Sequence, residues 1–132
     1  MRLLRSKPGG DFELSTFNAD DVPPYATLSH TWAEGEEVTY DELVAGKGKN
    51  KAGYAKLRFC GERATKDGMH YFWVDTCCID KQNNNELNTA LNSMFRWYQC
   101  ATRCYVCLSD VHVLDEVIDA QEFRITWDHQ LI

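Results

Sequence analysis

The feature that most constrains the fold is the alternation of short apolar runs with helical patterns between residues 25 and 108. The strand-like runs are "YATLS" (25–29), "MHYFWVDT" (69–76) and "RCYVCLSDV" (103–111). Between them, apolar residues recur every three or four positions over residues 54–66 and again over 87–101, which is typical of helices with one buried face. The order strand, helix, strand, helix, strand predicts an α/β domain in which helices cover both faces of a parallel sheet.

The remaining segments predict smaller elements around this core. Residues 1–17 hold two apolar segments around "SKPGGD", which favours a β-hairpin, and "NADDVPP" is an extended linker. "TYDELVAG" has the spacing of a capped short helix, with Thr39 and Glu42 at its start and Gly46 at its end. We expect a single domain over residues 1–132, divided into a hairpin and linker (1–24), an α/β core (25–111) and a C-terminal segment (112–132).

Composition excludes several classes of protein. The net charge of −6 argues against a nucleic-acid-binding surface, and the absence of a long apolar run predicts no membrane span. Residues 1–10 lack the apolar core of a signal peptide, so we expect the true start of a cytoplasmic protein with six reduced cysteines. Cys104 and Cys107 are three apart in a predicted strand and point to opposite faces, which favours buried thiols over a metal site.

Polar side chains follow each predicted strand at its carboxyl end. In an open parallel sheet these ends meet at one edge, where ligands bind. The three sets are Ser29, His30, Thr31 and Trp32; Asp75, Thr76, Cys77, Cys78 and Asp80; and Ser109, Asp110 and His112. Singly, Asp75 can cap a turn, Trp32 can pack in the core and His30 can be a structural histidine. Their convergence predicts a ligand-binding crevice formed by Ser29, His30, Trp32, Asp75, Cys78 and Asp80, with no metal.

The motifs Ser29-His30-x-Trp32 and Trp73-Val74-Asp75-x-x-Cys78-Ile79-Asp80, with "NNNELNTALNSMFRWYQCATRCYVCLSDV" after them, resemble the fungal heterokaryon incompatibility (HET) domain. The resemblance covers about residues 25–111. That family is similar to Toll/interleukin-1 receptor (TIR) domains, which implies a small flavodoxin-like sheet. It also implies regulated cell death in response to non-self fusion, and partners that are further copies, other HET proteins or receptor-type signalling proteins.

The resemblance ends before a third family motif rich in Trp, Gln, Glu and Leu, because the sequence stops at "ITWDHQLI". By analogy with TIR enzymes, which cleave NAD, that motif would hold the catalytic glutamate. We therefore expect a chain truncated before this motif, as either a fragment or a natural short form. We expect no NAD turnover and no certain cofactor, with NAD as a possible substrate. Glu86, Glu116 and Glu122 lie in no matching motif, and Glu86 fits a helix cap at Asn83 better.

Three functions remain open. The first is a signalling module that acts by self-association, and the second is an NAD-hydrolysing enzyme or its inactive remnant. The third is a thiol hydrolase in which Cys77 or Cys78 works with His30. We also predict that Trp97 departs from the buried stripe of its helix and marks a contact surface; the alternative is that Phe123 or Trp127 covers it.

Overall fold

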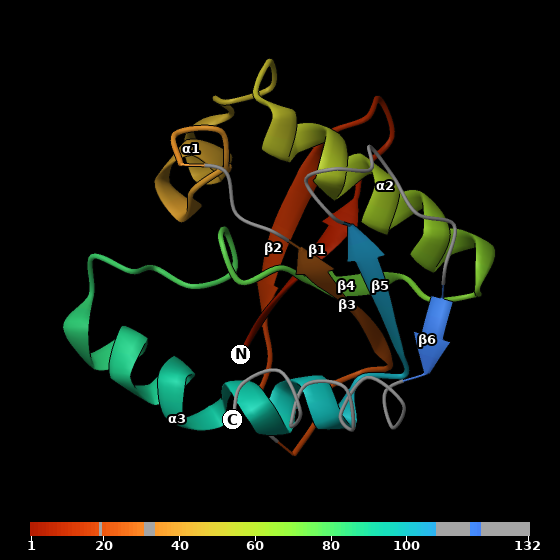
Figure 1. The fold of residues 1–132 in the computed structure, drawn as a ribbon, viewed down its shortest axis with the longest axis vertical. Helices are drawn as coiled ribbons and strands as arrows, with labels where there is room; N and C mark the ends of the chain where they lie inside the picture. Colours follow the sequence, from red (N-terminus) through yellow and green to blue (C-terminus); the bar gives the residue numbers. More distant parts are fainter. Residues whose placement is uncertain (19, 31–33, 108–116, 120–132) are drawn as a thin grey trace.

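The computed structural model describes residues 1–18, 20–30, 34–107 and 117–119, which form one sheet with helices on both sides (Figure 1). Six strands lie in the order β2-β1-β4-β3-β5-β6. Their bounds are β1 Arg2–Ser6, β2 Phe12–Thr16, β3 Tyr25–His30, β4 Tyr71–Trp73, β5 Arg103–Cys107 and β6 Val117–Asp119. Within these ranges no helix is long and apolar enough to cross a bilayer.

The sheet is mixed, which corrects the prediction of a parallel sheet. Its centre is parallel as predicted, because β3 pairs in parallel with both β4 and β5. The N-terminal hairpin is also present, but it joins the sheet through an antiparallel pairing of β1 with β4. On the other side β6 runs antiparallel to β5, within a C-terminal segment for which no strand was predicted. The hairpin thereby covers an edge that β4, only three residues long, would otherwise expose.

Helices α2 (Ala52–Lys66) and α3 (Asn84–Cys100) cover opposite faces, as predicted (Figure 1). Two neighbouring residues of β4 show this, because adjacent side chains on a strand point to opposite faces. Phe72 packs edge-on against Phe12 and lies close to Gly61 of α2, whereas Trp73 packs edge-on against Trp97 of α3. Both β4 side chains are fully buried, so the core has two layers.

Local signals set the helix ends. Helix α1 (Tyr40–Ala45) begins with the predicted capping box between Thr39 and Glu42, and Gly46 ends it at φ 71°. A left-handed residue at this position favours glycine. The side chain of Asn83 caps α3 by accepting from the backbone N–H of Glu86 at 3.2 Å, as predicted.

The second apolar run forms less strand than predicted. After Trp73 the chain turns, and the backbone N–H of Cys78 donates to the carbonyl of Val74 at 2.9 Å. The residues of this turn from Val74 to Ile79 remain buried. The run is apolar because both the short strand and the turn after it lie in the core. The apolar pattern of the sequence therefore does not show where the strand ends.

The buried face of α3 agrees in part with the predicted stripe, because Ala90 and Tyr98 are buried and Met94 packs against the core. Leu91 and Phe95 belong to the predicted apolar stripe but are exposed, whereas Trp97 is partly buried against the core. Trp97 packs against Trp73 with ring centroids 5.5 Å apart, so the prediction of an exposed Trp97 was wrong. The alternative cover, Phe123 or Trp127, lies outside the described residues.

Candidate functional site

The carboxyl ends of β3 and β4 bring His30 and Asp75 together. His30 is the last residue of β3, and Asp75 begins the turn after β4. The Nε2 atom of His30 lies 3.0 Å from Oδ1 of Asp75, and the imidazole is only 2% exposed. Two residues that are 45 positions apart in sequence are therefore side by side, as expected at the carboxyl ends of neighbouring parallel strands.

Two further charged residues complete the cluster. Nζ of Lys56, on α2, lies 3.1 Å from Nδ1 of His30 and donates to Oε2 of Glu37 at 2.7 Å. A second contact joins Nδ1 of His30 to Oε1 of Glu37 at 3.7 Å. We call His30, Glu37, Lys56 and Asp75 the charged cluster.

The closest contacts of the charged cluster favour one tautomer of His30. An ammonium group has only hydrogens to donate, so Nδ1 accepts from Lys56. The ring proton is then on Nε2, which donates to the Asp75 carboxylate. Both ring nitrogens are engaged and the ring is buried, so this geometry suits a positioning histidine better than a free general base.

A close backbone approach holds Glu37 in place. Gly53, in the first turn of α2, donates its N–H to the carbonyl of Glu36 at 2.8 Å. A Cβ on Gly53 would lie 2.6 Å from that carbonyl oxygen and 2.8 Å from Cα of Glu37. Only glycine allows this contact. The contact places Glu37 close to α2, where its carboxylate reaches Lys56, which lies about one helical turn after Gly53.

The sequence patterns did not predict Glu37, Lys56 or Gly53 as site residues. One signal was available for Lys56, because it stands four residues before Cys60 and so continues the buried stripe of α2. A charged residue on an apolar face points to a buried partner. Glu37 lies in the loop before α1 and carries no such signal.

A small hollow opens beside the charged cluster. It has a volume of about 200 Å³. Its lining residues are Glu37, Thr39, Tyr40, Asp41, Thr76, Ile79, Asp80, Lys81 and Gln82. Partial burial lowers the pKa of Lys81 from its usual value, and the nearby carboxylates of Asp75 and Glu37 oppose that shift. Pockets for drug-sized ligands run from about 300 to 1,000 Å³, so the described residues around this hollow leave room for a small group only.

The two cysteines of the motif lie inside the protein. Cys77 is fully buried, and this burial raises the pKa of its thiol well above the usual value. Sγ of Cys78 accepts from the backbone N–H of Val74 at 3.4 Å, which stabilises the turn after β4. A nucleophilic thiol needs an accessible thiolate, so neither residue suits the thiol-hydrolase hypothesis.

Thiol reactivity tests this arrangement. In the native protein we expect a maleimide to modify exposed Cys100 first, and buried Cys60, Cys77, Cys78 and Cys104 at least about tenfold more slowly. Peptide mapping by mass spectrometry over time gives the rate at each site. Rapid native labelling of Cys77 or Cys78 would show that the turn after β4 opens readily and would restore the thiol hypothesis.

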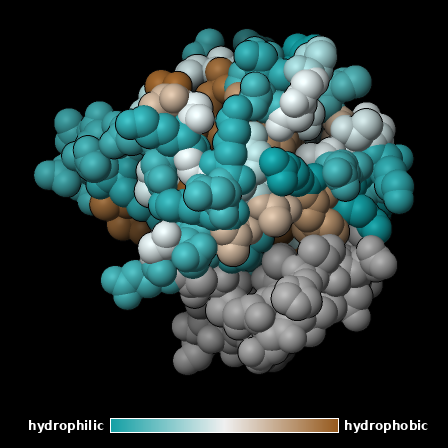
Figure 2. Space-filling model, turned by 90° about the horizontal axis from the view of Figure 1, so that it is seen from above, coloured by the Kyte–Doolittle hydropathy of each residue, from teal (hydrophilic) through white to brown (hydrophobic). Residues whose placement is uncertain are grey.

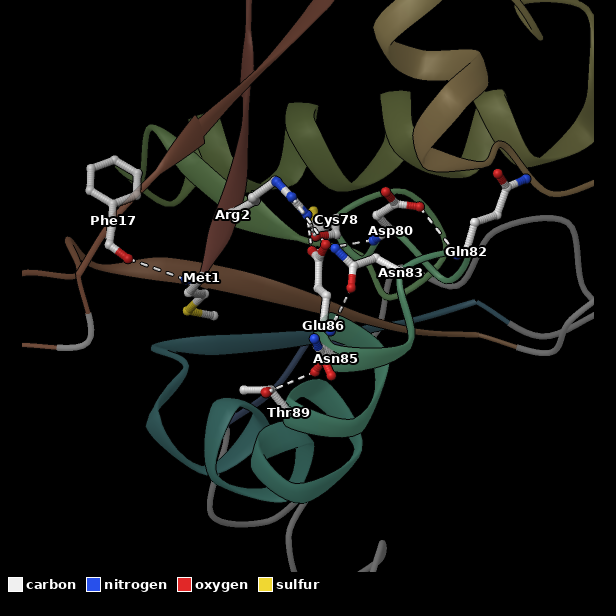
Figure 3. Close-up of polar contacts among 10 residues, drawn as sticks. All are labelled: Met1, Arg2, Phe17, Cys78, Asp80, Gln82, Asn83, Asn85, Glu86 and Thr89. Atoms are coloured by element: carbon white, nitrogen blue, oxygen red, sulfur yellow. Dashed lines mark hydrogen bonds and ion pairs between the residues drawn. The ribbon is translucent and has the colours of Figure 1, made fainter.

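Asp80 and Glu86 form a separate polar network at the start of α3 (Figure 3). Glu86 does not complete a capping box. Its carboxylate pairs with both terminal nitrogens of Arg2, one at 3.1 Å, and accepts from the backbone N–H of Asp80 at 3.3 Å. Oδ1 of Asp80 accepts from the N–H of Gln82 at 3.2 Å. Arg2 also lies over the ring of Tyr40, so this network ties β1 to α1 and α3.

The six predicted ligand-binding residues thus have different surroundings. His30 and Asp75 join in the charged cluster, and Asp80 lines the hollow beside it. Ser29 is partly buried on β3, while Cys78 lines a different cavity, next to α3. Trp32 and the residues after β5, namely Ser109, Asp110 and His112, lie outside the described residues, as do Glu116 and Glu122. In the described part of the chain no three His, Cys, Asp or Glu side chains are grouped to hold a metal ion.

A larger cavity among the described residues lies away from the charged cluster. It measures about 650 Å³ and runs between the β1–β2 hairpin and α2, with Phe12 and Gly61 in its wall. Its charged side chains are Asp11, Arg58, Glu62 and Lys66. Among its described lining residues none lies at the carboxyl end of a parallel strand, so size alone does not make it the candidate site.

Residues 25–130 match the family model described as heterokaryon incompatibility protein (HET). The chain is similar to vegetative incompatibility protein HET-E-1 of Podospora anserina, with 51% identity over 113 residues. This alignment covers 84% of the chain but 8% of that relative, so the chain spans a small part of the relative's length. No solved structure matches.

Proposed function

The chain belongs to the heterokaryon incompatibility family, and from this we propose that it is a signalling domain that triggers regulated cell death in fungal non-self recognition. In this proposal it works in the cytoplasm by self-association, and its partners are further copies or other HET and receptor-type signalling proteins. The observation that carries the proposal is the family match over residues 25–130, which includes both sequence motifs.

The charged cluster supports a binding function over a catalytic one. Both nitrogens of His30 are engaged within the protein, and the hollow beside the cluster is small. A buried polar network whose members satisfy one another fixes a single arrangement of the elements that it joins. Here it joins β3, β4, α2 and the loop before α1, so it can hold a surface in shape for assembly.

The alternative function is NAD hydrolysis by a TIR-like enzyme or its inactive remnant. The parallel strands β4-β3-β5 have the order 2-1-3 when counted along the chain, which is the order that begins a flavodoxin-like sheet. This order supports a flavodoxin-like, TIR-like fold. Asp75 could stabilise a ribosyl cation, and Asp80 reaches the adjoining hollow.

Two assays on the same purified protein separate these functions. Sedimentation velocity over a hundredfold range of protein concentration should show assembly, and incubation with NAD at high protein concentration should release no nicotinamide. Induced expression in a filamentous fungus should lower viability. Nicotinamide release well above a no-protein blank would favour the enzyme, and a monomer at every concentration would contradict self-association.

A further inference from the structure

One edge of the sheet presents unpaired backbone groups. Strand β2 is the outermost strand and pairs with β1 alone. Just beyond one end of the hairpin, Phe17 and Met1 exchange both backbone hydrogen bonds, at 2.9 and 3.2 Å. At the other end the N–H of Lys7 donates to the carbonyl of Asp11 at 2.7 Å. Bonded and non-bonded pairs alternate along an antiparallel ladder, so the bonded residues of this strand are 11, 13, 15 and 17.

The alternate residues Phe12, Leu14 and Thr16 therefore direct their N–H and C=O groups away from β1. Their partners on β1 agree with this, because Leu4, opposite Leu14, instead faces β4. Among the described residues, no hydrogen bond involves the outward groups of these three residues. Three donors and three acceptors thus form an open edge.

Strand β2 itself carries no proline, lysine or bulge that would block a further strand, and α1 contacts β2 near its Phe12 end. Natural edge strands carry proline, lysine or a bulge that blocks pairing. Strand β2 has the sequence FELST, its register with β1 is continuous, and its one charge, Glu13, lies opposite Arg5. Val44 of α1, 65% exposed, lines a hollow with Phe12 beside this edge. Hydrophilic residues cover most of the described surface on the face shown in Figure 2.

We propose that β2 is the self-association surface of this domain and that it pairs antiparallel with β2 of a second copy. This inference rests on the proposed self-association and names its interface. With Leu14 on the two-fold axis, Phe12 lies opposite the partner's Thr16, and all six outward groups on each strand find partners. Glu13 then faces the partner's Ser15. A register shifted toward Phe12 would place Glu13 opposite the partner's Glu13, and like charges directly opposite are unfavourable.

A proline at position 16 tests this interface. The N–H of Thr16 points outward, so Thr16→Pro removes a donor from the open edge and leaves the ladder to β1 intact. Thr16→Val is the matched control, because it keeps the N–H. In sedimentation equilibrium we expect wild type and Thr16→Val to dimerise alike and Thr16→Pro to dimerise at least about tenfold more weakly. Far-UV circular dichroism and urea unfolding check that each variant is folded.

The outcomes separate this inference from the proposed function. Equal dimerisation by folded Thr16→Pro would overturn the β2 interface while self-association survives, and a monomeric wild type would contradict both. If Thr16→Pro does not fold, a cross-link decides. The variant Glu13→Cys with Ser15→Cys, made in a Cys100→Ser background, should give an oxidised covalent dimer only if these positions face each other across the two-fold axis. The absence of that dimer at concentrations where the protein assembles would overturn the interface.

Discussion

Replacing Lys56 with methionine is expected to lower the free energy of unfolding by about 3 kcal/mol, because it removes one partner of a buried ion pair. The ammonium of Lys56 is 2.7 Å from Glu37 and 3.1 Å from His30, and its side chain is 15% exposed. Methionine keeps most of the aliphatic length but leaves the Glu37 carboxylate without this partner. Lys81 still lies near Glu37 and Asp75, which places the expected loss at the lower end of the usual range. Urea unfolding followed by fluorescence measures the change.

Lys49→Met is the matched control for Lys56→Met. Lys49 pairs with Asp11 at the similar distance of 2.7 Å, but both side chains are about half exposed. Exposed pairs contribute little, so Lys49→Met should cost far less stability than Lys56→Met. Adding Glu37→Gln to Lys56→Met should recover roughly 1 kcal/mol, because the uncompensated charge is removed. Equal costs for Lys56→Met and Lys49→Met would show that the charged cluster is not an electrostatic unit.

The position of the charged cluster changes how substitutions at the motif are interpreted. His30→Ala or Asp75→Ala would remove a contact to a ligand, but each would also break a buried network that connects two strands and a helix. Loss of function in either variant therefore counts as loss of binding only when the variant is as stable as wild type. Asp80→Asn is a cleaner probe of the hollow, because Asp80 lines it and makes no contact with the charged cluster that the structure shows.

The sequence predicted those parts of the fold that depend on local chemistry. Thr39 and Asn83 begin helices because their side chains accept from backbone N–H groups three residues later. The proximity of His30 and Asp75 was predictable too, because parallel strands with right-handed crossovers bring their carboxyl ends to one edge. These inferences use only nearest neighbours in the chain or a general rule of topology.

The parts that could not be predicted depend on long-range pairing. Nothing in "RLLRS" specifies that β1 inserts beside β4, since an antiparallel neighbour and a free hairpin have the same alternating pattern. The buried face of α3 was predicted only in part, because the apolar residues of this helix outnumber the positions that the core can cover. Trp97 packs against Trp73 in the core, whereas Leu91 and Phe95 remain exposed to solvent. Glu37 was missed because its place depends on a backbone contact with α2.

That backbone contact makes Gly53→Ala the second substitution with a large expected effect. An unhindered change from glycine to alanine in a helix stabilises by roughly 0.5–1 kcal/mol, so the sign of the effect is informative. Here the new Cβ would meet the carbonyl oxygen of Glu36 at 2.6 Å and Cα of Glu37 at 2.8 Å, and backbone atoms yield less easily than side chains. We expect a net loss of about 2 kcal/mol from overpacking.

Because the loop must move away from α2, Glu37 should separate from Lys56, and Lys56→Met should then cost clearly less in the Gly53→Ala background than in wild type. A double-mutant cycle by urea unfolding measures both quantities. Stability equal to or above wild type for Gly53→Ala would mean that the loop before α1 adapts freely, and that the charged cluster does not depend on the close approach of helix and loop.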